Sequence, residues 1–356
     1  MIGISLLTLK PGISGGSETY ARSLTHALAQ VGELEYQVFL PRSALDAGDG
    51  LPSQVARSYP ASRGTLVRIA AMGLATAYPG RLRRELELER LEAIHYPLSV
   101  MLPRVGKRLP VATSVHDLQH ELFPRFFSRA RLVYRRAVMG RAIARSRFVI
   151  TFSDYSAQVL RERKGLAPER VRVIPHGIDH DLFTPSGEKR EPFLLYPANR
   201  WPHKNHERLF EAFALLRREN PELRLVLTGS LHEGKPIPDG VEVRGHVSME
   251  ELVSLYRRAS CLVFPSLYEG FGQPPLEAMA CGCPVAVSHV ASLPEVCGDA
   301  ARYFDPTSPE EIAAAVSDAL SHPDELVSAG IARAALFTWE ECARRHEAVY
   351  RELAGS

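Results

Sequence analysis

Two successive series of alternating strand and helix patterns constrain this chain more than any other feature. Apolar runs typical of buried strands alternate with amphipathic stretches of helical period. In the first half they lie at residues 2–9, 36–40, 93–96, 111–115 and 148–152. The order restarts with runs at 193–198, 223–228, 241–245, 261–265 and 284–288. Each half is therefore predicted to be an α/β domain with a parallel sheet covered on both faces.

The length of the chain also favours two domains. Its 356 residues exceed the size at which a single hydrophobic core usually stops growing. The segment 173–187 is rich in turn formers and precedes a shift in composition. We expect a first domain over residues 1–190 and a second over 191–337, with a cleft between them.

Composition excludes several classes of protein. Hydrophobic residues at 45% and charged residues at 24% are typical of a soluble globular chain. No stretch of about 18 apolar residues predicts a membrane-spanning helix, and the N-terminus lacks the pattern of a signal peptide, so a cytoplasmic protein is expected. The five cysteines are expected to be buried, reduced thiols, because the spacing of Cys281 and Cys283 does not match a zinc site.

Charge is distributed unevenly between the halves. Residues 1–190 carry 28 Lys and Arg against 17 Asp and Glu, whereas residues 191–356 carry 15 against 24. The basic half suggests an anionic partner, either a phosphorylated acceptor or the inner face of a membrane, and residues 63–92 read as an amphipathic interfacial helix. Solvated helix faces explain both features equally well. No nucleic-acid partner is expected.

The segment SLYEGFGQPPLE at 266–277 is the most informative motif. Gly270 and Gly272 allow the backbone to approach a ligand closely, and Pro274 or Pro275 fits the first turn of a helix expected over 276–281. The N-terminus of such a helix attracts a diphosphate. The motif therefore predicts a phosphate-bearing ligand at the end of the strand 261–265.

Two glutamates of this motif are suited to different parts of that ligand. Glu277, expected in the first helical turn, can accept hydrogen bonds from a ribose diol. Glu269, at the exit of the strand, would lie beside a reacting sugar.

Two cations follow the first strand of the second half. Arg200 offers a planar fork and Lys204 a point charge, and both lie where open α/β sheets bind ligands. Together they suit a diphosphate. Glu207, at the start of the next helix, is expected to be a solvated side chain.

On these residues the chain resembles the retaining glycosyltransferases of family 4, which have the GT-B fold of two Rossmann-like domains. The resemblance rests on Glu269 and Glu277 in their motif and on Arg200 with Lys204. It also covers the GGSE run at 15–18, the pair His116 and Asp117, and the linker PHGID at 175–179. The run HDLQHELFP at 116–124 looks closest to a mannosyltransferase-like branch, which weights the donor towards GDP-mannose, with a UDP-sugar next.

The resemblance implies roles for individual residues. Arg200 and Lys204 would hold the donor diphosphate, and Glu277 the ribose hydroxyls. Glu269 would contact the transferring sugar together with the backbone of Gly270, Phe271 and Gly272. From the first domain, His116 would reach a sugar hydroxyl and Gly16 would approach the phosphate. It also implies that a C-terminal helix within residues 338–356 crosses back to the first domain, and that the reaction needs no metal or cofactor beyond the donor.

Other interpretations remain open from the sequence. His116 and His120 have the spacing of a zinc-protease helix, which indicates a metallohydrolase as an alternative. Asp179 and Asp181 resemble a metal-binding acidic triplet, although Asp is also common in turns. An epimerase or phosphorylase on the same fold is a further alternative, and the acceptor, glycan, lipid-linked or small molecule, is not identified.

Overall fold

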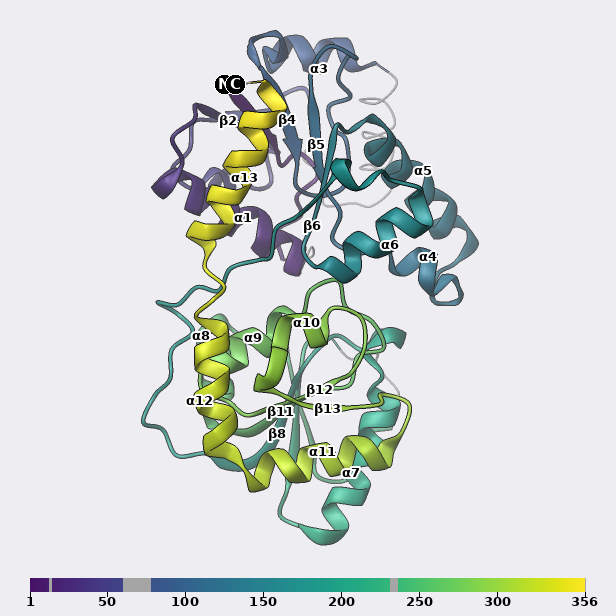
Figure 1. Cartoon of the computed structure of the whole chain (residues 1–356), viewed down its shortest axis with the longest axis vertical. Helices are drawn as coiled ribbons and strands as arrows, with labels where there is room; N and C mark the ends of the chain where they lie inside the picture. Colours follow the sequence, from purple (N-terminus) through teal and green to yellow (C-terminus); the bar gives the residue numbers. More distant parts are fainter. Residues whose placement is uncertain (13–14, 60–77, 231–235, 356) are drawn as a thin grey trace. The chain divides into compact units, whose positions relative to one another are not determined.

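The computed structural model describes residues 1–12, 15–59, 78–230 and 236–355 (Figure 1). Contacts between residues divide the chain into two compact units. The first comprises Met1–Phe152, Ser156–Gly177 and Trp339–Ser356, and the second comprises Ser153–Tyr155 and Ile178–Thr338. Each unit has its own sheet and its own covering helices.

The first unit is built on a parallel sheet. Seven strands within the described ranges form it in the order β3-β2-β1-β4-β5-β6-β7. They are β1 (Ile2–Ser5), β2 (Tyr36–Leu40), β3 (Ser53–Val55), β4 (Ala93–Tyr96), β5 (Val111–Ser114), β6 (Phe148–Thr151) and β7 (Val171–Val173). The helices are α1 (Gly16–Val31), α3 (Pro79–Glu85), α4 (Gln119–Leu122), α5 (Arg129–Arg145), α6 (Asp154–Lys164) and α13 (Trp339–Ala354).

The second unit repeats the same architecture. Among the described residues its sheet has six parallel strands in the order β10-β9-β8-β11-β12-β13. They are β8 (Glu191–Pro197), β9 (Arg224–Thr228), β10 (Val241–Gly245), β11 (Ala259–Phe264), β12 (Val285–Ser288) and β13 (Arg302–Phe304). The helices are α7 (His206–Glu219), α8 (Met249–Arg258), α9 (Gln273–Ala280), α10 (Leu293–Cys297), α11 (Pro309–Ser321) and α12 (Pro323–Ala334).

Both sheets reverse their strand order beside their first strand. In the first unit β1 pairs with β2 on one side and β4 on the other, and in the second unit β8 lies between β9 and β11. At such a reversal the loops after the two neighbouring strands diverge, and open α/β sheets bind their ligands there. In the second unit these are the loops that carry Arg200, Lys204 and Glu269.

The parallel α/β architecture predicted from the sequence is confirmed. The predicted bounds of β2, β4 and β10 match the structure, most other strands differ by one or two residues at an end, and β1 ends four residues earlier than expected. Three strands were not predicted: β3, β7 and β13, each with three residues and each at a sheet edge. Such short segments contain too few residues to show a periodic pattern.

The chain joins the second unit earlier than the shift in composition near residue 190 suggested. Ile178 already pairs with Thr338, and Arg257 Nε donates to the carbonyl oxygen of Thr184 over 2.8 Å. Residues 178–190 therefore pack as part of the second unit, because their backbone finds its hydrogen-bond partners there.

A chain of buried hydrogen bonds attaches α13 to the first unit. His346 Nδ1 lies 2.8 Å from the carbonyl oxygen of Cys342. Since a carbonyl only accepts, the proton is on Nδ1, and Nε2 accepts from the Tyr20 hydroxyl over 2.8 Å. Ser114 Oγ lies 2.8 Å from the same hydroxyl oxygen and must donate to it, because the Tyr20 proton is already used.

The same logic extends the chain to a second histidine. Ser114 Oγ accepts from His95 Nε2 over 2.8 Å, and His95 Nδ1 accepts from the Tyr350 hydroxyl over 2.7 Å. The path leaves α13 at Tyr350, passes through β4, β5 and α1, and returns to α13 one turn earlier, at His346. If either histidine were protonated, one hydrogen bond of this series would have two donors and no acceptor. The series is therefore complete only when both histidines are neutral. Burial lowers the pKa of His346 to about 4 and lowers that of His95 well below its ordinary value.

We predict that this series of buried hydrogen bonds makes the stability of the first unit sensitive to acid. A histidine whose pKa is lower when folded contributes stability above its unfolded pKa of about 6.5, and this is lost as pH falls towards the folded value. His346→Gln should lower the free energy of unfolding at pH 7.5 but make its decline between pH 6.5 and 4 shallower. Denaturant unfolding at several pH values measures this. His322→Gln, at an exposed position, is the control, and an unchanged slope for His346→Gln would contradict the assignment.

Candidate active site

The loop between β8 and α7 carries Arg200 and Lys204 and is fixed from several sides. Asn205 adopts a left-handed conformation, with φ of 59°, and its Nδ2 donates to the carbonyl oxygens of Pro265 and Pro306 over 3.0 and 2.7 Å. The Tyr196 hydroxyl donates to the carbonyl oxygen of Lys204 over 2.6 Å. The loop after β8 is thereby tied to the loop after β11.

Lys204 and Glu269 meet at the reversal of the second sheet. Lys204 Nζ lies 2.6 Å from Glu269 Oε1, and the two side chains are only 14% and 15% exposed. The backbone N–H of Leu267 donates to the carbonyl oxygen of His203 over 2.7 Å beside them. The lysine ammonium also lies 5.0 Å from the centre of the Phe264 ring. The structure thus brings together two site residues that are 65 positions apart.

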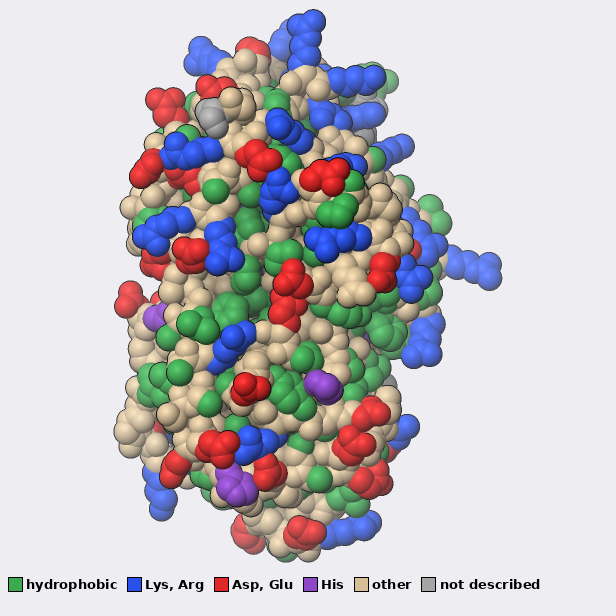
Figure 2. Space-filling model, viewed as in Figure 1, with side chains coloured by type: hydrophobic (Ala, Val, Ile, Leu, Met, Phe, Trp, Pro, Cys, Tyr) green, Lys and Arg blue, Asp and Glu red, His purple; other side chains and the backbone are tan. Residues whose placement is uncertain are grey.

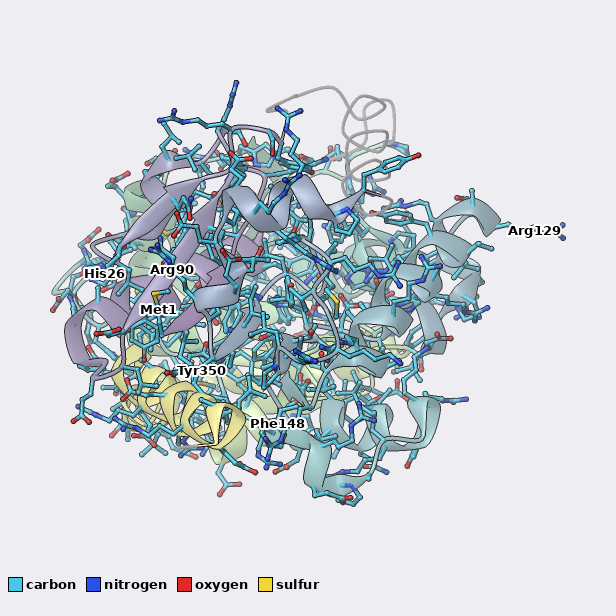
Figure 3. The ribbon with its side chains drawn as sticks, turned by 90° about the horizontal axis from the view of Figure 1, so that it is seen from above. Met1, His26, Arg90, Arg129, Phe148 and Tyr350 are labelled. Atoms are coloured by element: carbon cyan, nitrogen blue, oxygen red, sulfur yellow. The ribbon has the colours of Figure 1, made fainter. Side chains whose placement is uncertain are left out.

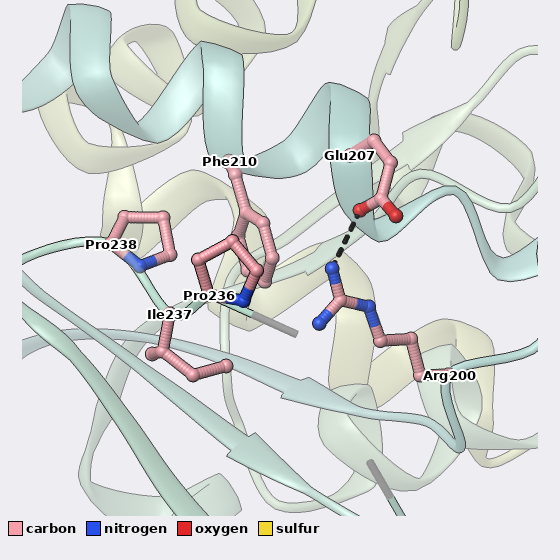
Figure 4. Close-up of a pocket in the computed structure, with 6 residues that line it drawn as sticks. All are labelled: Arg200, Glu207, Phe210, Pro236, Ile237 and Pro238. Carbon is pink, nitrogen blue, oxygen red and sulfur yellow. Dashed lines mark hydrogen bonds and ion pairs between the residues drawn. The ribbon is translucent and has the colours of Figure 1, made fainter. Parts of the chain in front are cut away.

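Arg200 points into a pocket on the α7 side of this loop (Figure 4). Its side chain is 7% exposed, its Nη2 donates to Glu207 Oε2 over 3.0 Å, and its guanidinium lies 5.3 Å from the centre of the Phe210 ring. Glu207 is 58% exposed at the start of α7, as expected for a solvated helix start. Its ion pair with Arg200 was not predicted, because it depends on how close α7 begins to the guanidinium.

The helix that follows the glycine-rich loop begins earlier than predicted. α9 starts at Gln273 rather than Leu276, so that Pro274 and Pro275 occupy its first turn. Prolines have the φ that a helix start requires but lack an N–H, so this turn offers fewer anion-binding donors than we expected. Glu277 is accordingly in the second turn, not the first. Gly272 precedes the helix with φ of 113°, which a side chain would strain.

Glu277 is buried beside a residue that the sequence did not indicate. The Tyr256 hydroxyl on α8 donates to Glu277 Oε2 over 2.9 Å, and the glutamate is 9% exposed. Burial raises the pKa of Glu277 to about 7 and outweighs the opposing effect of this hydrogen bond. Tyr256 lies in an amphipathic helix outside every motif, so no local signal pointed to it.

The loop between Glu269 and Gly272 is held by its carbonyl groups. The buried Ser292 hydroxyl approaches the carbonyl oxygens of Phe271 and Glu269, over 2.7 and 3.0 Å. The Phe271 ring is buried and packs edge-on against Phe337, with 5.9 Å between ring centres. Phe271, like Gly270 and Gly272, can therefore contact a ligand only through its backbone.

His116 and Gly16 belong to the first unit, where each follows the carboxyl end of a strand. His116 Nε2 donates to the carbonyl oxygen of Pro97 over 2.7 Å, so Nδ1 is the acceptor nitrogen. Burial lowers the pKa of His116. Gly16 is the first residue of α1, and an added Cβ would meet no described atom within 4 Å. Packing within the described structure does not account for that glycine.

The geometry does not support the metal sites considered from the sequence. His116 lies in a loop and His120 in the one-turn helix α4, so they do not face one site from adjacent turns of a long helix. Asp179 Oδ1 accepts from the backbone N–H groups of Asp181 and Leu182 over 3.1 Å, as in a turn. The described ranges hold no group of three or more His, Cys, Asp or Glu side chains suited to a metal ion. The five cysteines are buried and unpaired.

The described helices were compared with the requirements for spanning a membrane. Within the part of the chain that the structure describes, no helix combines the length and apolar character needed to cross a bilayer. The proposed interfacial segment 63–92 falls partly outside the described residues, and only α3 and the residues after it can be placed.

Comparison with sequence families covers most of the chain. "Glycosyltransferase Family 4" matches residues 14–182 and "Glycosyl transferases group 1" matches residues 180–334. O-antigen chain mannosyltransferase B of Escherichia coli is 30% identical over 266 residues, which is 68% of this chain and 70% of that protein. MMP alpha-(1->4)-mannosyltransferase of Mycolicibacterium hassiacum is 34% identical over 221 residues, 57% of this chain and 54% of that protein.

Solved structures share the fold at low sequence identity. Sucrose-phosphate synthase from Thermosynechococcus elongatus has a TM-score of 0.79 at 21% identity and covers 100% of this chain and 99% of its own. Anabaena Alr3699/HepE in complex with UDP and glucose has a TM-score of 0.72 at 18% identity, with 99% of each chain covered. The two parallel α/β units and these neighbours confirm the GT-B fold. Together with the sequence matches, they show that the chain belongs to glycosyltransferase family 4, in its mannosyltransferase-like branch.

Proposed function

We propose that the chain transfers a hexose, with retention of anomeric configuration, from a nucleoside diphosphate sugar to a glycan, lipid-linked or small-molecule acceptor. One observation supports this most directly. Lys204 and Glu269, from the loops after two neighbouring parallel strands, form an ion pair at the reversal of the second sheet, and Arg200 lies in the same loop as Lys204. That position and that charge suit a diphosphate next to a sugar.

In this proposal the second unit holds the donor. Arg200 and Lys204 bind the diphosphate, and Glu269 passes from Lys204 to the hydroxyls of the transferring sugar. The backbone of Gly270, Phe271 and Gly272 lines the sugar site, and Glu277 accepts from the ribose diol. The cations neutralise the departing diphosphate, so that neither a metal ion nor another cofactor is required.

The first unit would complete the site. Nδ1 of His116 would accept a hydrogen bond from a sugar hydroxyl, and Gly16 would leave room for the phosphate at the start of α1. Since each unit carries part of the proposed set, donor binding would require both.

GDP-mannose is the favoured donor, and a UDP-sugar is the next candidate. The names of the Escherichia coli and Mycolicibacterium hassiacum relatives support mannose, whereas the Anabaena protein was solved with UDP and glucose. Thermal unfolding with GDP, UDP, TDP and ADP tests the assignment. A ligand at 100 times its dissociation constant adds about 2.7 kcal/mol, so the correct nucleotide should shift the transition clearly. No shift with any of the four would overturn the proposal.

The first unit has a basic surface suited to an anionic or lipid-linked acceptor at a membrane. α5 contains six arginines and no acidic residue, and Val133 and Tyr134 on it are 69% and 45% exposed. Figure 2 shows many Lys and Arg side chains standing out from this unit, and Figure 3 shows Arg129 extending outward at the start of α5. We propose peripheral contact with an anionic lipid surface through this helix.

We expect Glu277→Gln to raise thermal stability and to lower nucleotide affinity. The folded pKa of about 7 lies above the unfolded value near 4.3, so the carboxyl costs stability as pH rises between these values, and the cost is complete above pH 7. The variant should therefore melt higher than the wild type at pH 8, with a smaller difference at pH 5. Nucleotide affinity should fall about 10- to 100-fold, since a hydrogen bond to a charged group is worth about 1.5–3 kcal/mol.

Calorimetry and thermal unfolding check both effects of Glu277→Gln. Glu211→Gln is the matched control, because Glu211 is 49% exposed and forms a surface ion pair with Arg208. Unchanged nucleotide affinity in the Glu277 variant would remove the ribose assignment.

Retention follows if the leaving diphosphate serves as the base. The bond from the anomeric carbon to the diphosphate oxygen breaks, the acceptor oxygen bonds to that carbon on the same face, and its proton passes to the diphosphate. An inverting reaction would instead need a base on the opposite face. The product should have the donor's anomeric configuration, which the one-bond carbon–proton coupling of the anomeric position reports for a mannoside. An inverted product would make His116 the candidate base.

A further inference from the structure

Arg200 is held in an unusual state for a buried cation. Its side chain is 7% exposed, yet among the described residues its Nε and Nη1 have no hydrogen-bond partner. Only Nη2 is bound, by Glu207 Oε2 at 3.0 Å. Buried charged donors are costly unless they are paired, so two unpaired positions on one guanidinium indicate a place for an acceptor that enters from outside.

Among the described residues, the pocket around Arg200 offers few acceptors. The pocket of about 490 Å³ is lined by Arg200, Glu207, Phe210, Pro236, Ile237 and Pro238. Figure 4 shows the second terminal nitrogen of the guanidinium turned towards Pro236 and Ile237, away from Glu207. The side chains on that side are apolar, and Glu207 is the only carboxylate among the six lining residues.

We propose that Glu207 is a positioning residue, which holds Arg200 ready for the diphosphate of the donor. Its carboxylate binds one nitrogen, and the Phe210 ring at 5.3 Å supports the guanidinium. The four-bond side chain is then ordered before the ligand arrives, which lowers the cost of binding. This inference deepens the proposed function, because it assumes that Arg200 receives the diphosphate.

At its location, Glu207 can hold Arg200 with little loss of free energy. Glu207 lies in the first turn of α7, where the helix dipole favours a carboxylate. It is 58% exposed, so it keeps much of its hydration while it holds a buried partner. None of the motifs that relate the chain to its family includes this residue.

A different role for Glu207 predicts the opposite change in diphosphate affinity when the residue is removed. If Glu207 only neutralised Arg200, it would compete with the incoming anion, and its removal would strengthen binding. If it positions Arg200, its removal weakens binding although the site becomes more positive. The direction of the change therefore separates the two roles.

The test compares Glu207→Ala, Glu207→Gln and Glu211→Ala. We expect Glu207→Ala to raise the KM for the donor about tenfold with kcat unchanged. Glu207→Gln retains an acceptor oxygen without the charge and should recover most of the loss. Glu211→Ala, one turn further along the same helix, should behave as the wild type. A lower KM in Glu207→Ala, or equal KM values for all three variants and the wild type, would overturn the proposal, and thermal unfolding of each variant identifies any that is misfolded.

Titration with inorganic pyrophosphate separates this inference from the donor assignment. Calorimetry should show weaker pyrophosphate binding in Glu207→Ala than in the wild type, with recovery in Glu207→Gln, whether or not the nucleotide sugar is correctly identified. Suppose that the three proteins show this order of pyrophosphate affinity but the wild type uses no nucleotide sugar. The proposed function then fails and the role of Glu207 stands. If the order of pyrophosphate binding is absent while transfer occurs, the role of Glu207 fails alone.

Discussion

The parallel pairing of β8 with β11 is the constraint on which the candidate site depends. Residues 191–197 and 259–264 are far apart in sequence, and their pairing sets the loops that follow them side by side. The side-chain amide of Asn205 and the backbone N–H of Leu267 then tie one loop to the other, each through a carbonyl oxygen of the opposite loop. Only with this frame in place can Lys204 meet Glu269 at 2.6 Å. The chemistry of the second unit is thus a consequence of sheet topology.

Both cations of the site are paired with carboxylates. Lys204 pairs with Glu269, and Arg200 with Glu207. Unpaired buried cations would be expensive, so these partners stabilise a site whose side chains are largely removed from water. A diphosphate that displaces one partner and supplements the other would exchange one set of ion pairs for another. Glu269 would then be released next to the sugar it is proposed to bind.

Much of the fold could be predicted from the sequence, because buried parallel strands read as continuous apolar runs. Val241–Gly245 and Ala93–Tyr96 were predicted with their observed bounds. Short edge strands such as Ser53–Val55 were not predicted, and α9 begins at Gln273, three residues before its expected start. Strand periodicity gives no information on either point.

The candidate site was predictable only where residues lie in motifs at strand ends. Arg200, Lys204, Glu269 and Glu277 were chosen on that basis, and their roles came from the family resemblance. The contacts of Tyr256 with Glu277 and of Glu207 with Arg200 were not predicted, because each is a three-dimensional contact made from an ordinary amphipathic helix. The buried hydrogen-bond chain through Tyr20 and His346 likewise has no local pattern.

The central claim is that the protein's own cations hold a diphosphate. Calorimetric affinities for GDP, GMP and guanosine, or for the uridine series if UDP binds better, test it most directly when measured with excess EDTA. We predict that affinity falls about tenfold or more from diphosphate to monophosphate, and that this difference disappears when Arg200 and Lys204 are both replaced by Ala. Equal affinities for the three ligands, or diphosphate binding that needs added Mg²⁺, would contradict the account.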